Sequence, residues 1–171
     1  MSSAPFVAIL MGSDSDLPTM QVTLDVLDKL NVPYEVKITS AHRTPDATHS
    51  YVRDADQRGC VVFIAAAGLA AHLAGTVAGL TLKPVIGVPM AGGPLNGEDA
   101  LLSTVMMPGG IPVATVAIGK AGAKNAGYLA AQIIALIDSA LATRLQQDRA
   151  DNAAAVIAKD QELQQQLAKK H

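Results

Sequence analysis

Residues 6–16 are Phe6-Val7-Ala8-Ile9-Leu10-Met11-Gly12-Ser13-Asp14-Ser15-Asp16, six apolar residues followed by a short polar loop. An unbroken apolar run of this length predicts a strand that is covered on both faces, as in a parallel sheet. The next segment, residues 17–30, carries Met20, Leu24 and Leu27 at helical spacing. The stretch therefore predicts a strand, a loop and a helix, which is the first unit of an α/β fold.

The same unit recurs along the chain. Further strands are predicted at 34–39, 60–66, 84–90 and 113–118, and helices at 46–58, about 76–80, 98–106 and 123–147. Five strands alternating with helices indicate a doubly wound parallel sheet, and right-handed crossovers place all strand-to-helix loops at one edge. We expect the loops at 12–16, 40–45, 67–75 and 91–97 to converge there and form a site.

The second of these loops carries the residues best suited to chemistry, Ser40-Ala41-His42-Arg43-Thr44-Pro45. Histidine titrates near neutral pH, and the arginine fork binds phosphate or carboxylate. Each residue alone is also compatible with a structural role, as a packed histidine or an ion-paired arginine. Their adjacency at a sheet edge predicts acid–base chemistry on an anionic substrate.

The first loop predicts contacts to a phosphorylated sugar. Gly12 permits a tight turn, and backbone amides at a helix start attract phosphate. Ser13 and Ser15 add hydroxyl donors, and Asp16 can accept hydrogen bonds from sugar hydroxyls. Capping of the following helix by Ser15 or Asp16 is an equally compatible role. The loop matches neither the dinucleotide fingerprint nor a Walker loop.

Composition limits the classes of function. The 171 residues carry 13 Lys and Arg against 15 Asp and Glu, a net charge of −2, without a basic cluster. This argues against nucleic-acid binding, and no apolar run reaches the roughly 20 residues of a membrane span. The N-terminal residues show no targeting pattern, so we expect a cytoplasmic protein that binds neither nucleic acid nor membrane.

The chain is expected to form one catalytic domain, residues 1–148, and a helical extension, residues 149–171. The extension has a thin apolar stripe, so we expect it to pack on the domain or on a neighbouring subunit. Cys60 lies in an apolar run and is predicted to be a buried core thiol. The sequence has no paired-histidine or paired-cysteine motif, so no metal site is expected.

Six ordered motifs between about residues 7 and 140 resemble one known family. They are Gly12-Ser13-x-Ser15-Asp16, Ser40 to Pro45, Ala70-Ala71-His72-Leu73, Pro84-Val85-x-Gly87-Val88-Pro89, Met107-Pro108-x-Gly110-x-Pro112-Val113 and Ala117-Ile118-Gly119-x-Ala121-x-x-x-Asn125-Ala126. The chain resembles the N5-carboxyaminoimidazole ribonucleotide mutases (PurE) of purine biosynthesis. The resemblance implies a flavodoxin-like three-layer sandwich with a central parallel sheet, assembled as a homo-octamer. It also implies an isomerase without metal, nucleotide or biotin, which moves a carboxylate from N5 of a ribonucleotide to C4 of its imidazole ring.

Site roles follow from this resemblance. His42 is the implied general acid and base. Ser13, Asp16 and Arg43 would contact the ribose phosphate, while Ser40, Gly68, His72 and Leu73 would lie near the ring and its carboxylate. The chain departs from the usual family pattern at Ala74 and Met106. We expect these two departures to affect the shape of the loops more than the type of reaction.

Three other functions are compatible with the residues. The nearest is direct carboxylation of aminoimidazole ribonucleotide by CO₂, although Ala70-Ala71-His72-Leu73 is the form typical of the mutases. A noncatalytic nucleotide- or flavin-binding module would have the same sheet and no need of His42. A receiver-like signalling module would use Asp14 and Asp16 to bind Mg²⁺. Such a site would also require an aspartate after the third strand, and no aspartate follows that strand here.

Overall fold

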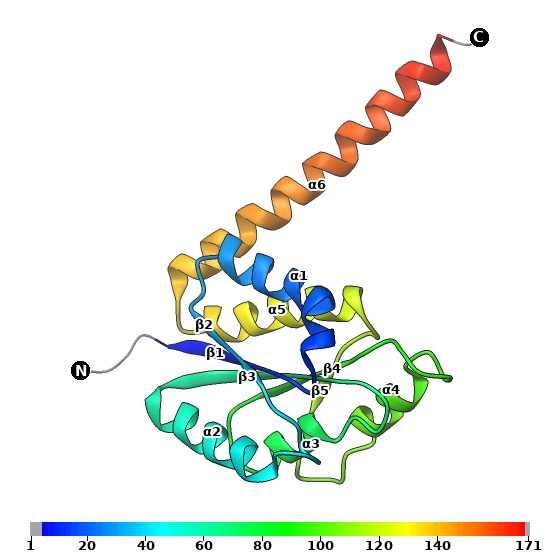
Figure 1. The fold of residues 1–171 in the computed structure, drawn as a ribbon. Coiled ribbons are helices and arrows are strands. Elements are labelled where there is room, and N and C mark those ends of the chain that lie inside the picture. Colours follow the sequence, from blue (N-terminus) through cyan, green and yellow to red (C-terminus); the bar gives the residue numbers. More distant parts are fainter. Residues whose placement is uncertain (1–4, 170–171) are drawn as a thin grey trace.

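The structure is a computed structural model that describes residues 5–169 (Figure 1). Its strands are β1 (Phe6–Met11), β2 (Tyr34–Ile38), β3 (Cys60–Ala67), β4 (Val85–Pro89) and β5 (Ala114–Thr115). Its helices are the 3₁₀ turn η1 (Asp14–Asp16), α1 (Leu17–Lys29), α2 (Pro45–Arg58), α3 (Leu73–Ala78), α4 (Glu98–Val105), α5 (Lys120–Ala135) and α6 (Ser139–Ala168). Strands and helices alternate through α5, as predicted.

The five strands form one parallel sheet in the order β2-β1-β3-β4-β5. This is the flavodoxin-like order, in which the chain direction across the sheet reverses between β1 and β3. Loops that leave the carboxyl ends of those two strands diverge to opposite faces and leave a crevice between them. The predicted fold class is therefore confirmed, and the order places the crevice beside the loops after β1 and β3.

Both faces of the sheet are covered, which explains the continuous apolar run in β1. Val7, Ile9 and Met11 pack into the core beneath α1 and α5, while Ala8 and Leu10 pack into the core on the α2 and α3 side. Figure 1 shows these helices on opposite sides of the sheet. Successive side chains of a strand point to opposite faces, so a strand between two helical layers must be apolar at every position.

Three predicted elements differ from the structure. The helix expected at about 76–80 begins earlier, at Leu73, inside the segment expected to be a loop, and is α3. The strand expected at 113–118 is only Ala114–Thr115, although the Val116 N–H still donates to the Gly87 carbonyl, 3.1 Å away. The helix expected at 123–147 is interrupted at 136–138 and becomes α5 and α6. Asp138 has an extended backbone and its side chain accepts the Leu141 N–H at 2.9 Å, so it caps a new helix there.

The C-terminal extension is part of α6 rather than a separate element. The helix runs unbroken from Ser139 through the expected boundary at residue 148 and projects away from the sheet (Figure 1). Every residue from Arg149 to Lys169 is exposed in the single chain, including Val156 and Leu163. This segment, residues 149–168, is called the arm below. The domain itself does not cover the arm, and residues 170–171 lie outside the described part of the chain.

Candidate active site

A cavity of about 690 Å³ opens at the carboxyl ends of β1, β2, β3 and β4. All eight residues predicted for the site line it: Ser13, Asp16, Ser40, His42, Arg43, Gly68, His72 and Leu73. The four loops expected to converge each contribute to its wall, which confirms that part of the prediction. The cavity is the crevice that the strand order creates.

Two histidines from different loops meet in this cavity. Nε2 of His42 lies 2.7 Å from Nδ1 of His72, and the two rings pack edge to face with centroids 4.9 Å apart. Because two imidazole nitrogens share one hydrogen bond, one must donate and the other accept, so the two tautomers are linked. Both side chains are exposed to the cavity rather than packed in a core. The sequence had placed both in the site but gave no sign that they touch.

The turn that carries His42 and Arg43 is held by hydrogen bonds from its own residues. The Ser40 hydroxyl accepts the His42 N–H at 3.3 Å and the Arg43 N–H at 3.1 Å. The Ser40 carbonyl accepts the Thr44 N–H at 2.9 Å, and the Thr44 hydroxyl accepts the Ser40 N–H at 2.9 Å. Ser40 therefore contributes to the site by fixing the backbone of titratable His42 and of charged Arg43.

The first loop forms a capping box around η1. The Ser13 hydroxyl accepts the Ser15 N–H at 3.2 Å, and the Asp16 carboxylate accepts the Ser13 N–H at 3.2 Å. Asp16 is half-buried, and this burial raises its pKa above the usual carboxyl value; the nearby Asp14 adds to the rise, while the Ser13 bond opposes it. The N-cap is therefore Ser13 rather than Ser15, Asp16 completes the capping box, and both Ser13 and Asp16 also line the cavity.

The third and fourth loops contact each other at the cavity wall. Leu69, which follows Gly68, has a positive φ of 55° and its side chain lies against Gly93, where a Cβ would be 2.6 Å from it. Sequence reasoning named the glycine-rich loop but did not select Gly92 or Gly93 as wall residues. The sequence signal for them was the Gly-Gly pair directly after a buried strand.

The two departures from the family pattern lie away from this wall. Ala74 is buried in α3 with 2% of its surface exposed, and Met106 is 78% exposed beyond α4. Neither residue lines the cavity. The substitutions therefore leave the set of residues around the His42–His72 pair unchanged.

Cys60 is buried, as predicted, and burial raises the pKa of its thiol to about 11. Within residues 5–169, no group of three or more His, Cys, Asp and Glu side chains is arranged to hold a metal ion. Over the same residues, no helix combines the length and apolarity that crossing a membrane requires.

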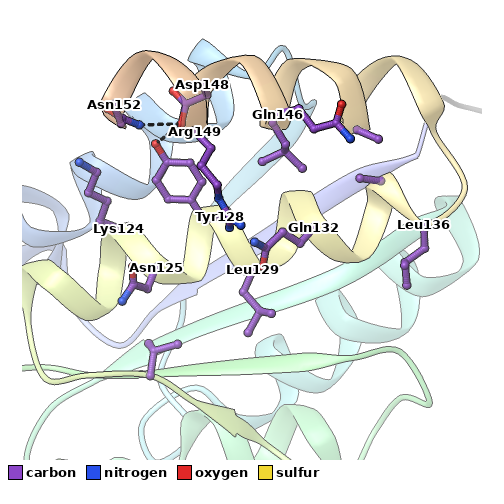
Figure 2. Close-up of a pocket in the computed structure, with 14 residues that line it drawn as sticks. Lys124, Asn125, Tyr128, Leu129, Gln132, Leu136, Gln146, Asp148, Arg149 and Asn152 are labelled. Carbon is purple, nitrogen blue, oxygen red and sulfur yellow. Dashed lines mark hydrogen bonds between the residues drawn. The ribbon is translucent and has the colours of Figure 1, made fainter. Parts of the chain in front are cut away.

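A second cavity of similar volume, about 670 Å³, lies between α5 and α6 (Figure 2). Its wall combines apolar Leu129 and Leu136 with the polar ends of Lys124, Gln132 and Arg149. No residue predicted for the site lies in it, and it lacks a histidine. Volume alone does not separate the two cavities, so the convergence of titratable and anion-binding side chains identifies the first as the candidate active site.

Known proteins share both the sequence and the fold. Residues 6–155 match the family described as AIR carboxylase. The chain is 54% identical to the N5-carboxyaminoimidazole ribonucleotide mutase of Bacillus subtilis, covering 93% of this chain and 98% of that protein. It is 56% identical to the enzyme of the same name from Haemophilus influenzae, covering 85% of this chain and 89% of that protein. The solved structure of Treponema denticola PurE superposes with a TM-score of 0.84 at 31% identity, covering 94% and 99% of the two chains. The chain therefore belongs to the AIR carboxylase family, and its similar curated relatives are N5-carboxyaminoimidazole ribonucleotide mutases.

Proposed function

We propose that this chain is a mutase that converts N5-carboxyaminoimidazole ribonucleotide to 4-carboxy-5-aminoimidazole ribonucleotide in purine biosynthesis. The observation that carries the proposal is one cavity holding a histidine pair beside Arg43. Acid–base chemistry on a phosphorylated substrate needs these groups, whereas a noncatalytic binding module has no need of His42. The names of the relatives favour the mutase over the direct carboxylase.

In the proposed reaction His42 acts first as an acid and then as a base. Protonated His42 gives its proton to N5, the bond between N5 and the carboxylate carbon breaks, and CO₂ leaves. The aminoimidazole is then an enamine, and C4 attacks the CO₂ held beside it. Neutral His42 removes the C4 proton, which restores the aromatic ring and returns His42 to its starting state.

His72 assists this proton transfer in the proposal. Its Nδ1, 2.7 Å from His42 Nε2, provides a partner for that nitrogen before substrate binds and fixes the plane of the His42 ring. A fixed ring plane lowers the cost of aligning the proton with N5 and later with C4. His72 is in this sense a positioning residue, and it contacts substrate only if the bond to His42 opens.

Three further wall residues, Arg43, Ser13 and Asp16, bind the ribose phosphate in the proposal. Arg43 supplies a permanent cation with a fork of N–H donors, which suits a phosphate dianion. The Ser13 hydroxyl is a further donor, and the Asp16 carboxylate accepts from ribose hydroxyls. Gly68 and Leu73 are proposed to lie against the ring and its carboxylate, and no cofactor takes part.

The experiment that tests this function compares two substrates. Purified protein receives N5-carboxyaminoimidazole ribonucleotide in ¹³C-bicarbonate, and separately receives aminoimidazole ribonucleotide in the same buffer. The proposal expects rapid formation of C4-carboxylated product from the first substrate, mostly without ¹³C because the CO₂ stays in the cavity. Faster, fully labelled product from the second substrate would instead identify a direct carboxylase. Binding without product from either would leave a noncatalytic module.

We further propose a homo-octamer in the cytoplasm, in which the arm packs on a neighbouring subunit. The arm carries Val156, Ile157, Leu163 and Leu167 with 44% to 67% of their surfaces exposed. An isolated helix with a single apolar stripe gains little stability in water. The open cavity between α5 and α6 begins at the base of the arm and offers a second apolar surface for the neighbour (Figure 2).

Assembly is tested by charge substitutions on the arm. Leu163→Lys is expected to lower the mass measured by light scattering, because a lysine cannot be buried unpaired in a subunit contact. Gln165→Lys adds the same charge on the opposite side of the helix and should leave the mass unchanged. An octamer that persists equally in both variants would contradict a role for the arm.

A further inference from the structure

Three threonine hydroxyls meet beneath the turn that carries His42. The Thr39 and Thr48 hydroxyl oxygens lie 2.7 Å apart, and those of Thr39 and Thr44 lie 3.2 Å apart. Thr39 is 4% exposed and Thr48 is fully buried. Thr39 directly follows β2, Thr44 lies in the turn and Thr48 lies in α2, so the hydroxyls join three segments at one point.

The cluster is connected to the turn through two carbonyl groups. The Thr48 hydroxyl lies 3.1 Å from the Thr44 carbonyl and 3.5 Å from the Ser40 carbonyl, and the Thr44 hydroxyl also donates to the Ser40 carbonyl at 3.2 Å. Ser40 in turn binds the backbone N–H groups of His42 and Arg43. Thr48 is therefore linked by hydrogen bonds, through Ser40, to the residue that carries the proton.

Packing alone gives no reason for a hydroxyl at this place. Valine has nearly the same shape as threonine and would fill the space between β2 and α2 without a polar group to satisfy. A hydroxyl network also constrains the relative orientation of the segments it joins, because each hydrogen bond is favourable only over a narrow range of angles. Such a network restricts the turn more than apolar contacts of the same volume would.

We propose that the hydroxyls of Thr39, Thr44 and Thr48 form a network that positions His42 for proton transfer, in which Thr48 links α2 to the turn. The role of His42 in this inference rests on the proposed function. The restriction of the turn by the three hydroxyls does not depend on that function. Thr48 touches no substrate in this scheme and is a positioning residue. Its loss should change turnover more than substrate binding, since Arg43 can still reach the phosphate through a flexible side chain.

The test compares Thr48→Val, Thr48→Ser and the control Thr104→Val. Thr104 is a matched control: it is 2% exposed on α4, and its hydroxyl donates to the carbonyl four residues earlier, as that of Thr48 does. Thr48→Val is expected to lower kcat about fivefold to tenfold and to change KM by no more than about twofold. This loss is smaller than the roughly 100-fold loss expected when a catalytic group is displaced by 1 Å. Thr48→Ser should recover most of the loss, and Thr104→Val should keep the original kcat.

A second readout does not depend on activity. The backbone N–H of Thr44, bonded to the Ser40 carbonyl at 2.9 Å, should exchange with deuterium several-fold faster in Thr48→Val than in Thr104→Val. Lack of turnover by the unaltered protein would refute the proposed function, while the exchange rates would still decide the positioning role. Equal kcat in Thr48→Val and Thr104→Val, or equal exchange of the Thr44 amide, would overturn the inference.

Discussion

Asp148 fixes the base of α6 to the rest of the domain, and replacing it should loosen the arm. Its side chain is 5% exposed, accepts the Tyr128 hydroxyl at 2.8 Å and the Asn152 amide at 3.0 Å, and pairs with the Lys29 ammonium. Figure 2 shows Tyr128, Asp148 and Asn152 together at one end of the α5–α6 cavity. In Asp148→Ala the exposed Lys29 and Asn152 turn to water, while the partly buried Tyr128 hydroxyl loses its charged acceptor.

The expected cost is therefore that of one hydrogen bond to a charged group, about 1.5–3 kcal/mol of unfolding free energy. With a urea dependence of about 2 kcal/mol per molar, the unfolding midpoint should fall by roughly 1 M. The control is Asp151→Ala, one turn along the same helix, whose exposed carboxylate accepts the Gln147 amide at 2.7 Å. A midpoint shift no larger in Asp148→Ala than in Asp151→Ala, at equal protein concentration, would refute the reasoning.

The same carboxylate gives a pH test. The hydrogen bond from Lys29 is the main cause that holds the pKa of Asp148 below its usual value, with Tyr128 adding to the effect. A carboxyl whose pKa is lower in the folded state stabilises the fold above its unfolded pKa, and this contribution is lost as the pH falls through the folded pKa. The stability difference between the unaltered protein and Asp148→Ala should thus be full at neutral pH and shrink below about pH 4. A difference that grows with acidity would contradict the assignment.

Three further substitutions test the site and the sheet. His42→Asn should lower kcat by about 100-fold to 10,000-fold with little change in substrate affinity, measured by kinetics and calorimetry; full turnover would exclude His42 as the proton carrier. Arg43→Ala should weaken substrate binding about 10-fold to 100-fold, as loss of a charge-assisted bond does, and unchanged affinity would count against a phosphate contact. Gly87→Ala would place a Cβ 2.4 Å from a methyl group of buried Thr104, so the thermal midpoint should drop by several degrees; Gly109→Ala, with open space around it, is the control.

Local patterns in the sequence predicted the order of elements and much of the site. The apolar run at 6–11 indicated a strand between two layers, and the loops with small and polar residues after each strand indicated one functional edge. Gly59 ends α2 with a φ of 101°, a left-handed conformation that glycine adopts at helix C-termini. These features follow from side-chain chemistry at neighbouring positions, so a single sequence is enough to find them.

Contacts between distant positions needed the tertiary structure. His42 and His72 are 30 residues apart and follow β2 and β3, and only the placement of these two strands on either side of β1 brings the His42 Nε2 and His72 Nδ1 atoms to 2.7 Å from each other. The break at Asp138 was missed because the alanine-rich sequence around it is typical of a continuous helix.

The sequence by itself determined the α/β class, the sheet edge that carries function and the residue types available there, since these depend on local hydrophobicity and chemistry. Tertiary structure alone decided which side chains meet. It paired His42 with His72, gathered the hydroxyls of Thr39 and Thr48 under the turn, and left the arm uncovered by its own domain. Such contacts depend on how elements far apart in the chain pack, and hydrophobic periodicity does not specify the partner of an individual polar group.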